Sequence, residues 1–258
     1  MQTLSVLRYP GGKSRAIETV FSLIPKDTKK LCSPFFGGGS IELYCASRGI
    51  TVYGYDLFSP LVNFWKCMNK DSERLAEKIE LLFGKIPKLN KNDFYDLQKN
   101  HREDFSIKDY EWEKAAIFFV LNRSSFCGST LSGGMSPNHP RFNKQSVERV
   151  RNFNVKNFSI ECTDFEKAIN KHPNTLLYLD PPYLIKNCLY GKKGSTHRGF
   201  EHERLCSLLK QRKNWILSYN DNPEILEMYA GFEVLRPQWK YGMSSNKNSK
   251  EVIILGEK

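Results

Sequence analysis

Residues 31–56 read LCSPFFGGGSIELYCASRGITVYGYD, and this stretch decides the fold. One apolar run leads into three glycines, a periodic segment follows, and a second apolar run ends in an acid. The pattern predicts a strand, weakened by its proline, then a loop, a helix and a second strand, over Leu31–Phe36, Gly37–Ser40, Ile41–Arg48 and Thr51–Tyr55. Two strands joined through a helix lie parallel, so an α/β fold with a mostly parallel sheet is expected.

The same two patterns continue along the rest of the chain. Apolar residues recur three and four positions apart in further predicted helices, over Ser14–Leu23, Leu61–Met68, Asp71–Phe83, Lys91–Lys99, Trp112–Leu121, Phe165–Asn170, Phe200–Leu209 and Pro223–Met228. Short apolar runs predict further strands, over Asn157–Glu161, Thr175–Leu179, Trp215–Ser218, Gly231–Leu235 and Glu251–Leu255. We therefore expect helices on both faces of the sheet.

The segment 61–154 is charged and contains no predicted strand. It includes Asn122–Asn143, which is rich in Gly, Ser, Asn and Pro and predicts a long loop or hairpin. Long loops inside compact domains are usually functional. We predict two units: a core of residues 1–60 and 155–258, and an inserted, mainly helical lobe of residues 61–154.

Composition and charge restrict the class of protein. The 258 residues carry a net charge of +11, which favours a polyanionic partner. Glu148 is the one acid between residues 121 and 158, against six basic residues: Arg123, Arg141, Lys144, Arg149, Arg151 and Lys156. Seven scattered cysteines predict reduced thiols in a cytoplasm, with neither a disulfide frame nor a metal site. No apolar run is long enough for a membrane span, and the first residues do not resemble a signal peptide.

The run 176–183, LLYLDPPY, places polar groups directly after a buried strand. Proline cannot donate to a β-ladder, so the strand ends there. Asp180 and the carbonyl of Pro181 can accept both hydrogens of an exocyclic amine, while Pro182 fixes the turn and Tyr183 offers a face for a base. The carboxyl ends of strands are where ligands bind in open α/β sheets. An ordinary turn is the alternative interpretation.

The glycine loop and Asp56 predict a nucleoside site. Glycines allow a ligand to approach the backbone, and an acid after the next strand can bind two ribose hydroxyls. The loop lacks the dinucleotide spacing, so S-adenosyl-L-methionine fits better than NAD; a loop that only caps the helix is the alternative. Asp164 and Phe165 follow another strand and are candidates for adenine, although Asp164 is equally suited to cap a helix. Lys13, beside Tyr9, is a candidate for the methionine carboxylate or a solvated turn residue.

These motifs together resemble the Dam-type, D12-class DNA adenine-N6 methyltransferases. The similar stretches are Arg8–Lys13, Ser33–Ser40, Tyr55–Asp56, Asn122–Gly128, Asp180–Tyr183, Phe200–Leu205, Leu217–Asn220 and 244–254. The stretches occur in the same order as in the family, and together they span nearly the whole chain. The resemblance implies a Rossmann-like methyltransferase fold, double-stranded DNA as substrate, and flipping of the target adenine into the Asp180 site.

The resemblance implies cofactor contacts at Tyr9, Lys13, Asp56 and Asp180, and a catalytic motif at Asp180, Pro181, Pro182 and Tyr183. The residue patterns add further candidates for the cofactor: Phe36, Gly37, Gly38, Gly39, Ser40, Asp164 and Phe165. DNA contacts are expected at Arg123, Phe126, Leu131, Arg141 and Lys144. Leu131 stands where GATC-specific members carry a guanine-reading arginine, so we expect a different site. Phe126 is expected to enter the duplex, with a core position as the alternative.

Other substrates and roles stay open at this point. Cytosine N4, an RNA base or a glutamine amide presents the same NH₂ group, and a non-catalytic DNA-binding subunit of the same fold is a further alternative. A restriction endonuclease is a candidate partner, while the oligomeric state is open.

Overall fold

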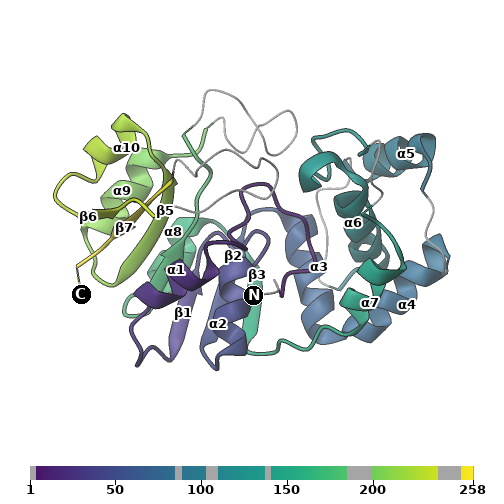
Figure 1. Cartoon of the computed structure of the whole chain (residues 1–258), viewed down its shortest axis with the longest axis horizontal. Coiled ribbons are helices and arrows are strands. Elements are labelled where there is room, and N and C mark those ends of the chain that lie inside the picture. Colours follow the sequence, from purple (N-terminus) through teal and green to yellow (C-terminus); the bar gives the residue numbers. More distant parts are fainter. Residues whose placement is uncertain are drawn as a thin grey trace.

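The computed structural model describes residues 4–84, 89–102, 110–136, 141–184, 199–237 and 251–257. Its strands are β1 (Lys30–Ser33), β2 (Thr51–Asp56), β3 (Phe158–Cys162), β4 (Leu176–Leu179), β5 (Trp215–Asn220), β6 (Glu233–Leu235) and β7 (Glu251–Leu255). Its helices are α1 (Ile17–Leu23), α2 (Ser40–Ser47), α3 (Ser59–Lys70), α4 (Ser72–Phe83), α5 (Lys91–Arg102), α6 (Trp112–Ser124), the 3₁₀ turn η1 (Phe126–Gly128), α7 (Lys144–Arg151), α8 (Phe165–Lys171), α9 (His202–Lys210) and α10 (Pro223–Met228) (Figure 1).

The seven strands form one sheet in the order β3-β2-β1-β4-β5-β7-β6. β1 to β5 pair in parallel, whereas β7 runs antiparallel to both β5 and β6. The prediction of a mostly parallel α/β sheet is confirmed. Because the chain moves outward from β1 through β2 to β3 and then returns to β4 on the other side of β1, the order reverses between β1 and β4. Ligands bind at such a reversal, beyond the carboxyl ends of the strands.

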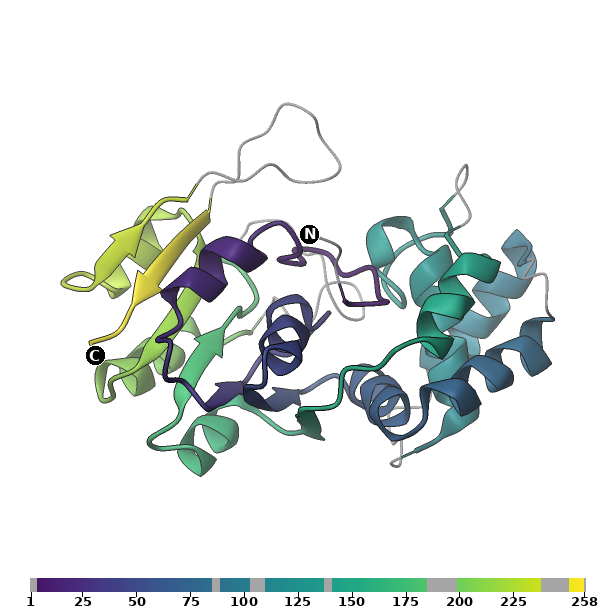
Figure 2. The same cartoon turned by 60° about the horizontal axis from the view of Figure 1, so that its bottom comes forward.

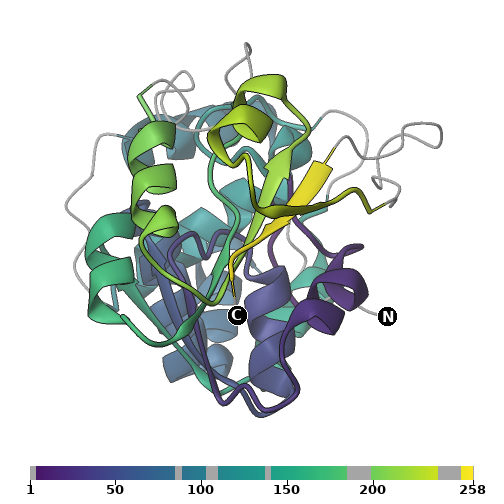
Figure 3. The ribbon, with the colours of Figure 1, turned by 90° about the vertical axis from the view of Figure 1, so that its left-hand side faces the viewer.

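The two faces of the sheet bury separate cores. Side chains alternate between the faces along each strand, and Tyr178 joins one cluster while its neighbours Leu177 and Leu179 join the other. The first cluster includes residues of α1, α2 and α3, and the second includes residues of α8, α9 and α10. Figure 3 shows the purple and blue α1 and α2 on one side of the strands and the green α8 and α9 on the other.

Helices α4 to α7 gather at one side of the molecule, away from the sheet (Figures 1 and 2). α6 contacts α3, α4 and α5, and α4 also contacts α7. α3 contacts both this group and the strands β2 and β3, and its Trp65 Nε1 donates to the Gly37 carbonyl at 3.0 Å. The lobe and the sheet therefore share a packed boundary, and a division at residues 60 and 154 stays our proposal.

The structure adds helix α7, which the sequence interpretation omitted, and ends β1 earlier than predicted. α7 begins after Asn143, whose side chain accepts from the backbone N–H of Ser146 while the Ser146 hydroxyl accepts from the Asn143 N–H, forming a capping box. β1 ends at Ser33, directly before Pro34, rather than at Phe36. A proline has no N–H to continue the ladder, which explains the earlier end.

Candidate active site

Three loops meet at the carboxyl edge of the central strands. The glycine loop follows β1, Asp56 ends β2 and Asp180 follows β4, and these strands are neighbours in the sheet. Parallel strands end at the same edge, so the predicted residues of the glycine loop, Asp56 and Asp180 are brought to one side of the molecule.

Lys13 binds the predicted catalytic aspartate. Its Nζ lies 2.9 Å from each carboxylate oxygen of Asp180 and 2.7 Å from the Tyr183 hydroxyl, and it donates to the Gly11 carbonyl at 3.1 Å. The Lys13 side chain is 3% exposed and that of Asp180 is 22% exposed. The three hydrogens of the ammonium group are thus all engaged. Lys13 orients Asp180, and a contact to a cofactor carboxylate would require one of these bonds to be given up.

Burial and charge act in opposite directions on this pair. Burial by itself lowers the pKa of Lys13, but the nearby carboxylates of Asp180 and Glu251 outweigh it, and the pKa of Lys13 is raised. Burial raises the pKa of Asp180, and the Lys13 cation opposes that rise. Lys13 therefore stays charged at neutral pH, and its charge favours the ionised form of Asp180.

Glu251, at the start of β7, also belongs to this cluster. Its Oε1 accepts from the Tyr183 hydroxyl at 2.6 Å and lies 3.5 Å from Lys13 Nζ. The Tyr183 ring packs near the Tyr219 ring, with centroids 5.9 Å apart and 26° between planes. We did not predict Glu251 as a site residue. The available signal was a carboxylate at the start of an otherwise apolar strand.

The glycine loop is covered by Tyr9. A Cβ on Gly38 would lie 2.6 Å from Cβ of Tyr9, and one on Gly37 would lie 2.9 Å from the Tyr9 ring, so only glycine fits there. The loop ends at Gly39, whose φ of 68° lies in the left-handed region, and Ser40 begins α2.

Phe36 differs from the expected cofactor contact. It is 2% exposed and packs against Trp65, Phe158 and Gly54, where a Cβ would lie 2.2 Å from the Phe36 ring. Its side chain therefore belongs to the core beneath the loop. This burial argues against a cofactor contact by the Phe36 ring.

Asp56 accepts two backbone hydrogen bonds. The N–H groups of Gly37 and Phe58 donate to Oδ2 and Oδ1 at 3.0 and 2.9 Å. Burial raises the pKa of Asp56, while these bonds oppose the rise. A carboxylate has about four lone-pair directions, so two are left for ribose hydroxyls. The residue is both fixed to the glycine loop and able to bind a ligand.

Asp164 caps α8, as one of the two sequence interpretations held. Its Oδ1 accepts from the Lys167 N–H at 2.9 Å, and its Oδ2 lies 3.2 Å from Lys167 Nζ. Phe165 is nearly buried against Phe35 and Phe200, whose ring centroids lie 5.8 and 5.4 Å from its own. Phe35, which we did not single out, is half-buried at this place and is a better ring for cofactor contact than Phe36.

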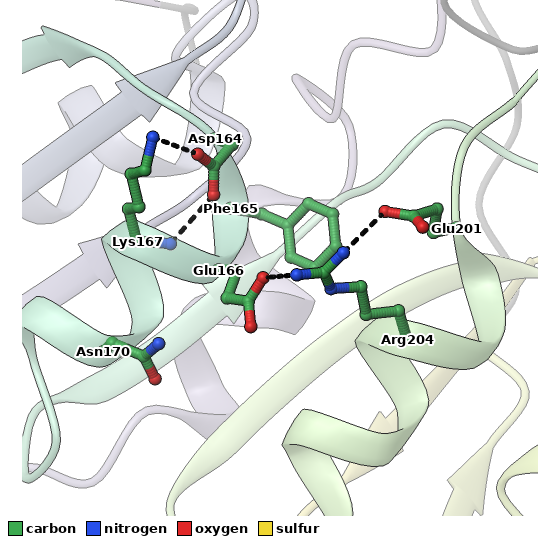
Figure 4. A pocket seen from close by; sticks show the side chains of 7 residues that line it. All are labelled: Asp164, Phe165, Glu166, Lys167, Asn170, Glu201 and Arg204. Atoms are coloured by element: carbon green, nitrogen blue, oxygen red, sulfur yellow. Dashed lines mark hydrogen bonds and ion pairs between the residues drawn. The ribbon is translucent and has the colours of Figure 1, made fainter.

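A hollow of about 410 Å³ lies beside Asp164 and Phe165, between α8 and the start of α9 (Figure 4). Arg204 of α9 pairs with Glu166 of α8 and with Glu201 at the start of its own helix. The charged side chains of its wall are thus paired with one another. The hollow adjoins the predicted adenine position but is not lined by Asp56 or Asp180.

The predicted DNA residues fall into two groups. Phe126, in η1, is 61% exposed, which excludes the alternative that it is a core residue. Leu131 is 6% exposed and packs in a cluster with Phe94 and Leu121. Its burial argues against a direct DNA contact at Leu131.

The basic residues of the lobe form a repelling cluster with the N-terminal segment. Burial, together with the guanidinium groups of Arg149, Arg8 and Arg141, lowers the pKa of Arg123 to about 10. Arg141 and Lys144 are exposed. Such a gathering of positive charge suits a phosphate backbone.

The N-terminal segment joins the lobe to the catalytic edge. The Asn122 side chain accepts from the Arg8 N–H at 2.9 Å and donates to the Arg8 carbonyl at 2.7 Å. A Cβ on Gly128 would lie 2.1 Å from that carbonyl. Figure 2 shows the purple segment reaching from α1 to the teal helices of the lobe. Asn122, part of the motif expected to begin the DNA-reading hairpin, thus has a structural contact of its own.

Several features fall outside this site. Residues 137–140 of the predicted hairpin and the motif 244–246 lie outside the described residues. The six cysteines that the structure describes are free thiols. Within the described ranges, no group of three or more potential ligands suited to a metal ion is found, and no helix has the length and hydropathy of a membrane span.

Comparison with known proteins agrees with this geometry. The family model described as D12 class N6 adenine-specific DNA methyltransferase matches residues 9–243. The chain is 26% identical to the type II methyltransferase M1.LlaDCHI of Lactococcus lactis subsp. cremoris, over 88% of this chain and 84% of the relative. It is 25% identical to the type II methyltransferase M.MjaIII of Methanocaldococcus jannaschii, over 91% and 90%. It is 22% identical to a DNA adenine methylase of Haemophilus influenzae, over 95% and 89%. The chain therefore belongs to the D12 class of N6 adenine-specific DNA methyltransferases.

Proposed function

We propose that this chain transfers a methyl group from S-adenosyl-L-methionine to N6 of adenine in double-stranded DNA, at a site other than GATC. The observation that carries the proposal is the half-buried Asp180, held by the buried Lys13 at the reversal of the strand order. When bound, S-adenosyl-L-methionine supplies an electrophilic methyl group on a sulfonium centre. Membership of the family implies this methyl donor.

The residues at the edge of the sheet fit that cofactor. Asp56 keeps lone pairs for two ribose hydroxyls, and the glycine loop offers backbone without side chains. When both carboxyl groups are ionised, Asp180 and Glu251 carry two negative charges beside the single positive charge of Lys13. The cluster then suits a positively charged ligand. The ring of Phe165 and the cap residue Asp164 are our candidates for the adenine.

Asp180 and the Pro181 carbonyl would act on the target base. Both accept hydrogen bonds from the two N–H groups of the adenine amine, which keeps the nitrogen lone pair directed at the methyl group. Tyr183 would stack on the base. A stacked base in a duplex is out of reach, so the adenine must be flipped out. The orientation of the base and the fixed electrostatic environment would then accelerate the methyl transfer, which requires no covalent intermediate.

The test replaces Asp180 and measures products and binding separately. Asp180→Ala and Asp180→Asn should each leave less than about a hundredth of the turnover, by analogy with the loss of one fixed electrostatic contact. Affinity for DNA, measured by fluorescence anisotropy, should change little. Asp27→Ala, in an exposed turn, is the matched control. Turnover by either Asp180 variant above a few per cent of wild type would refute the assigned role of Asp180. Nucleoside analysis of the DNA methylated by the wild-type protein identifies the methylated base.

The sequence preference needs its own experiment. Leu131 is aliphatic and buried, so it cannot make a bidentate contact to guanine. Genomic DNA from cells that express the chain, sequenced for N6-methyladenine, should show methylation at another site. Methylation confined to GATC would contradict this part of the proposal. Because two relatives are named type II methyltransferases, we further propose a restriction endonuclease as functional partner, whose cleavage the methylated DNA should resist.

A further inference from the structure

We propose that Glu251 is a positioning residue for the methyl transfer, which fixes the Tyr183 ring and shares Lys13 with Asp180. The proposal rests on the proposed function of this site. It assigns a role to a residue of the antiparallel strand β7, although the other residues of the cluster follow parallel strands or precede α1.

The direction of β7 explains how Glu251 reaches the site. β7 is antiparallel to β5, and Glu251 pairs in register with Asn220, the last residue of β5. The first residue of β7 therefore lies at the same edge as the last residues of the parallel strands. Asp180 follows β4, the neighbour of β5 on its other side. A carboxylate at the start of β7 is thereby placed beside a carboxylate that follows β4.

Three contacts fix the Tyr183 side chain. Its ring packs against Tyr219, and its hydroxyl donates to Oε1 of Glu251 at 2.6 Å while accepting from Lys13 at 2.7 Å. A ring held at its face and at its hydroxyl cannot turn without losing one of these contacts. The Tyr183 ring is half-buried, so it keeps accessible surface for a base.

The charge of Glu251 acts on the same cation as Asp180. The Glu251 side chain is 2% exposed, and its Oε1 lies 3.5 Å from Lys13 Nζ. Burial raises the pKa of Glu251, Lys13 lowers it, and the negative charge of Asp180 raises it. Lys13 is thus the common counter-ion of two carboxylates, the buried Glu251 and the half-buried Asp180. Removing either charge leaves the cation to the other one.

The experiment compares Glu251→Ala, Glu251→Gln, Tyr183→Phe and the double variant Glu251→Ala/Tyr183→Phe. Single-turnover methylation by Glu251→Ala should fall by about 10²-fold, since misplacing a group by about 1 Å has that effect, with unchanged DNA affinity. Glu251→Gln keeps an acceptor for Tyr183 and should recover most of the rate. Its acid limb in the pH–rate profile should move to lower pH, because a like charge near Asp180 is gone. Glu233→Gln, an exposed residue at the start of β6, is the control.

The double variant tests the route through Tyr183. If Glu251 acts by holding the Tyr183 hydroxyl, Glu251→Ala should slow the Tyr183→Phe enzyme far less than it slows wild type. The same lack of additivity is expected in urea unfolding, which needs no catalysis. Additive effects in both measurements, or a Glu251→Ala rate within about threefold of wild type, would overturn the proposal. If Glu251→Ala does not fold, Glu251→Gln provides the test. A pH–rate profile of Glu251→Gln identical to that of wild type would then overturn the proposal. If the wild-type protein does not methylate DNA but the unfolding energies of the two substitutions are still non-additive, the proposed function is wrong and the contact between Glu251 and Tyr183 stands.

Discussion

Glu42 provides the sharpest test of the energetics at this site. It lies in the first turn of α2, directly after the glycine loop, and is 3% exposed. The Ser33 hydroxyl donates to its Oε1 at 2.7 Å. Burial raises the pKa of Glu42 from 4.5 to about 8, against the opposing effect of hydrogen bonds from nearby backbone N–H groups and Ser33. The folded protein therefore holds Glu42 in its protonated form at neutral pH.

The consequence for stability follows from proton linkage. Below pH 4.5, Glu42 is protonated in both the folded and the unfolded chain, and its contribution does not vary. Between 4.5 and 8 the unfolded chain releases the proton and the folded chain keeps it, so the free energy of unfolding falls as pH rises. The loss is about 1.4 kcal/mol per pH unit, or about 4 kcal/mol between pH 5 and 8. Above pH 8 the loss stays constant.

Glu42→Gln removes this titration and keeps the size of the protonated side chain. We expect the stability of the variant relative to wild type to increase by about 4 kcal/mol from pH 5 to pH 8, a relative rise in Tm of about 10 °C for a chain of this size. Thermal unfolding of both proteins across that range measures it. Glu18→Gln, at an exposed residue in the first turn of α1, is the matched control for the substitution itself. A Glu42→Gln difference that does not change with pH would refute the reasoning.

Two further substitutions separate the lobe's structural and DNA-binding residues. Asn122→Ala leaves the Arg8 N–H and carbonyl without their side-chain partner and should lower the free energy of unfolding by about 2–4 kcal/mol, measured by urea titration against the exposed control Asn170→Ala. Phe126→Ala should change stability by less than about 0.5 kcal/mol, yet weaken DNA binding by about 5- to 100-fold through lost base stacking. The exposed Leu81→Ala is its control, and equal DNA affinity for the two variants would exclude a DNA contact at Phe126.

The parallel part of the fold could be predicted from the sequence because its strands are short apolar runs that end at polar residues. Asp56 and Asp180 were found in this way, since each comes directly after a run that must be buried. α7 was omitted although Asn143 and Ser146 carry its capping box. α7 has only two apolar side chains, the buried Val147 and Val150, so it shows little of the periodicity on which the prediction depended.

The side-chain contacts within the site could not be predicted from the sequence. Lys13 and Asp180 are 167 positions apart, and no local pattern indicates that their side chains meet. The role of Glu251 depends on strand direction: in a parallel β7 its first residue would lie at the opposite edge of the sheet. Phe35 and Phe36 show a similar limit, because neighbouring residues point to opposite sides and the sequence does not say which ring is buried.

The N-terminal segment links the two halves of the proposed reaction. At Arg8 it is hydrogen-bonded to Asn122, at the end of α6 and close to η1, and at Lys13 it binds Asp180. Tyr9, between them, packs on the glycine loop. One short segment therefore contacts α6 of the lobe, the glycine loop and the carboxylate that we propose to hold the target amine. A Cβ on Gly37 or Gly38 would lie less than 3.0 Å from Tyr9, so the segment can pack on the loop this closely only because both positions are glycine.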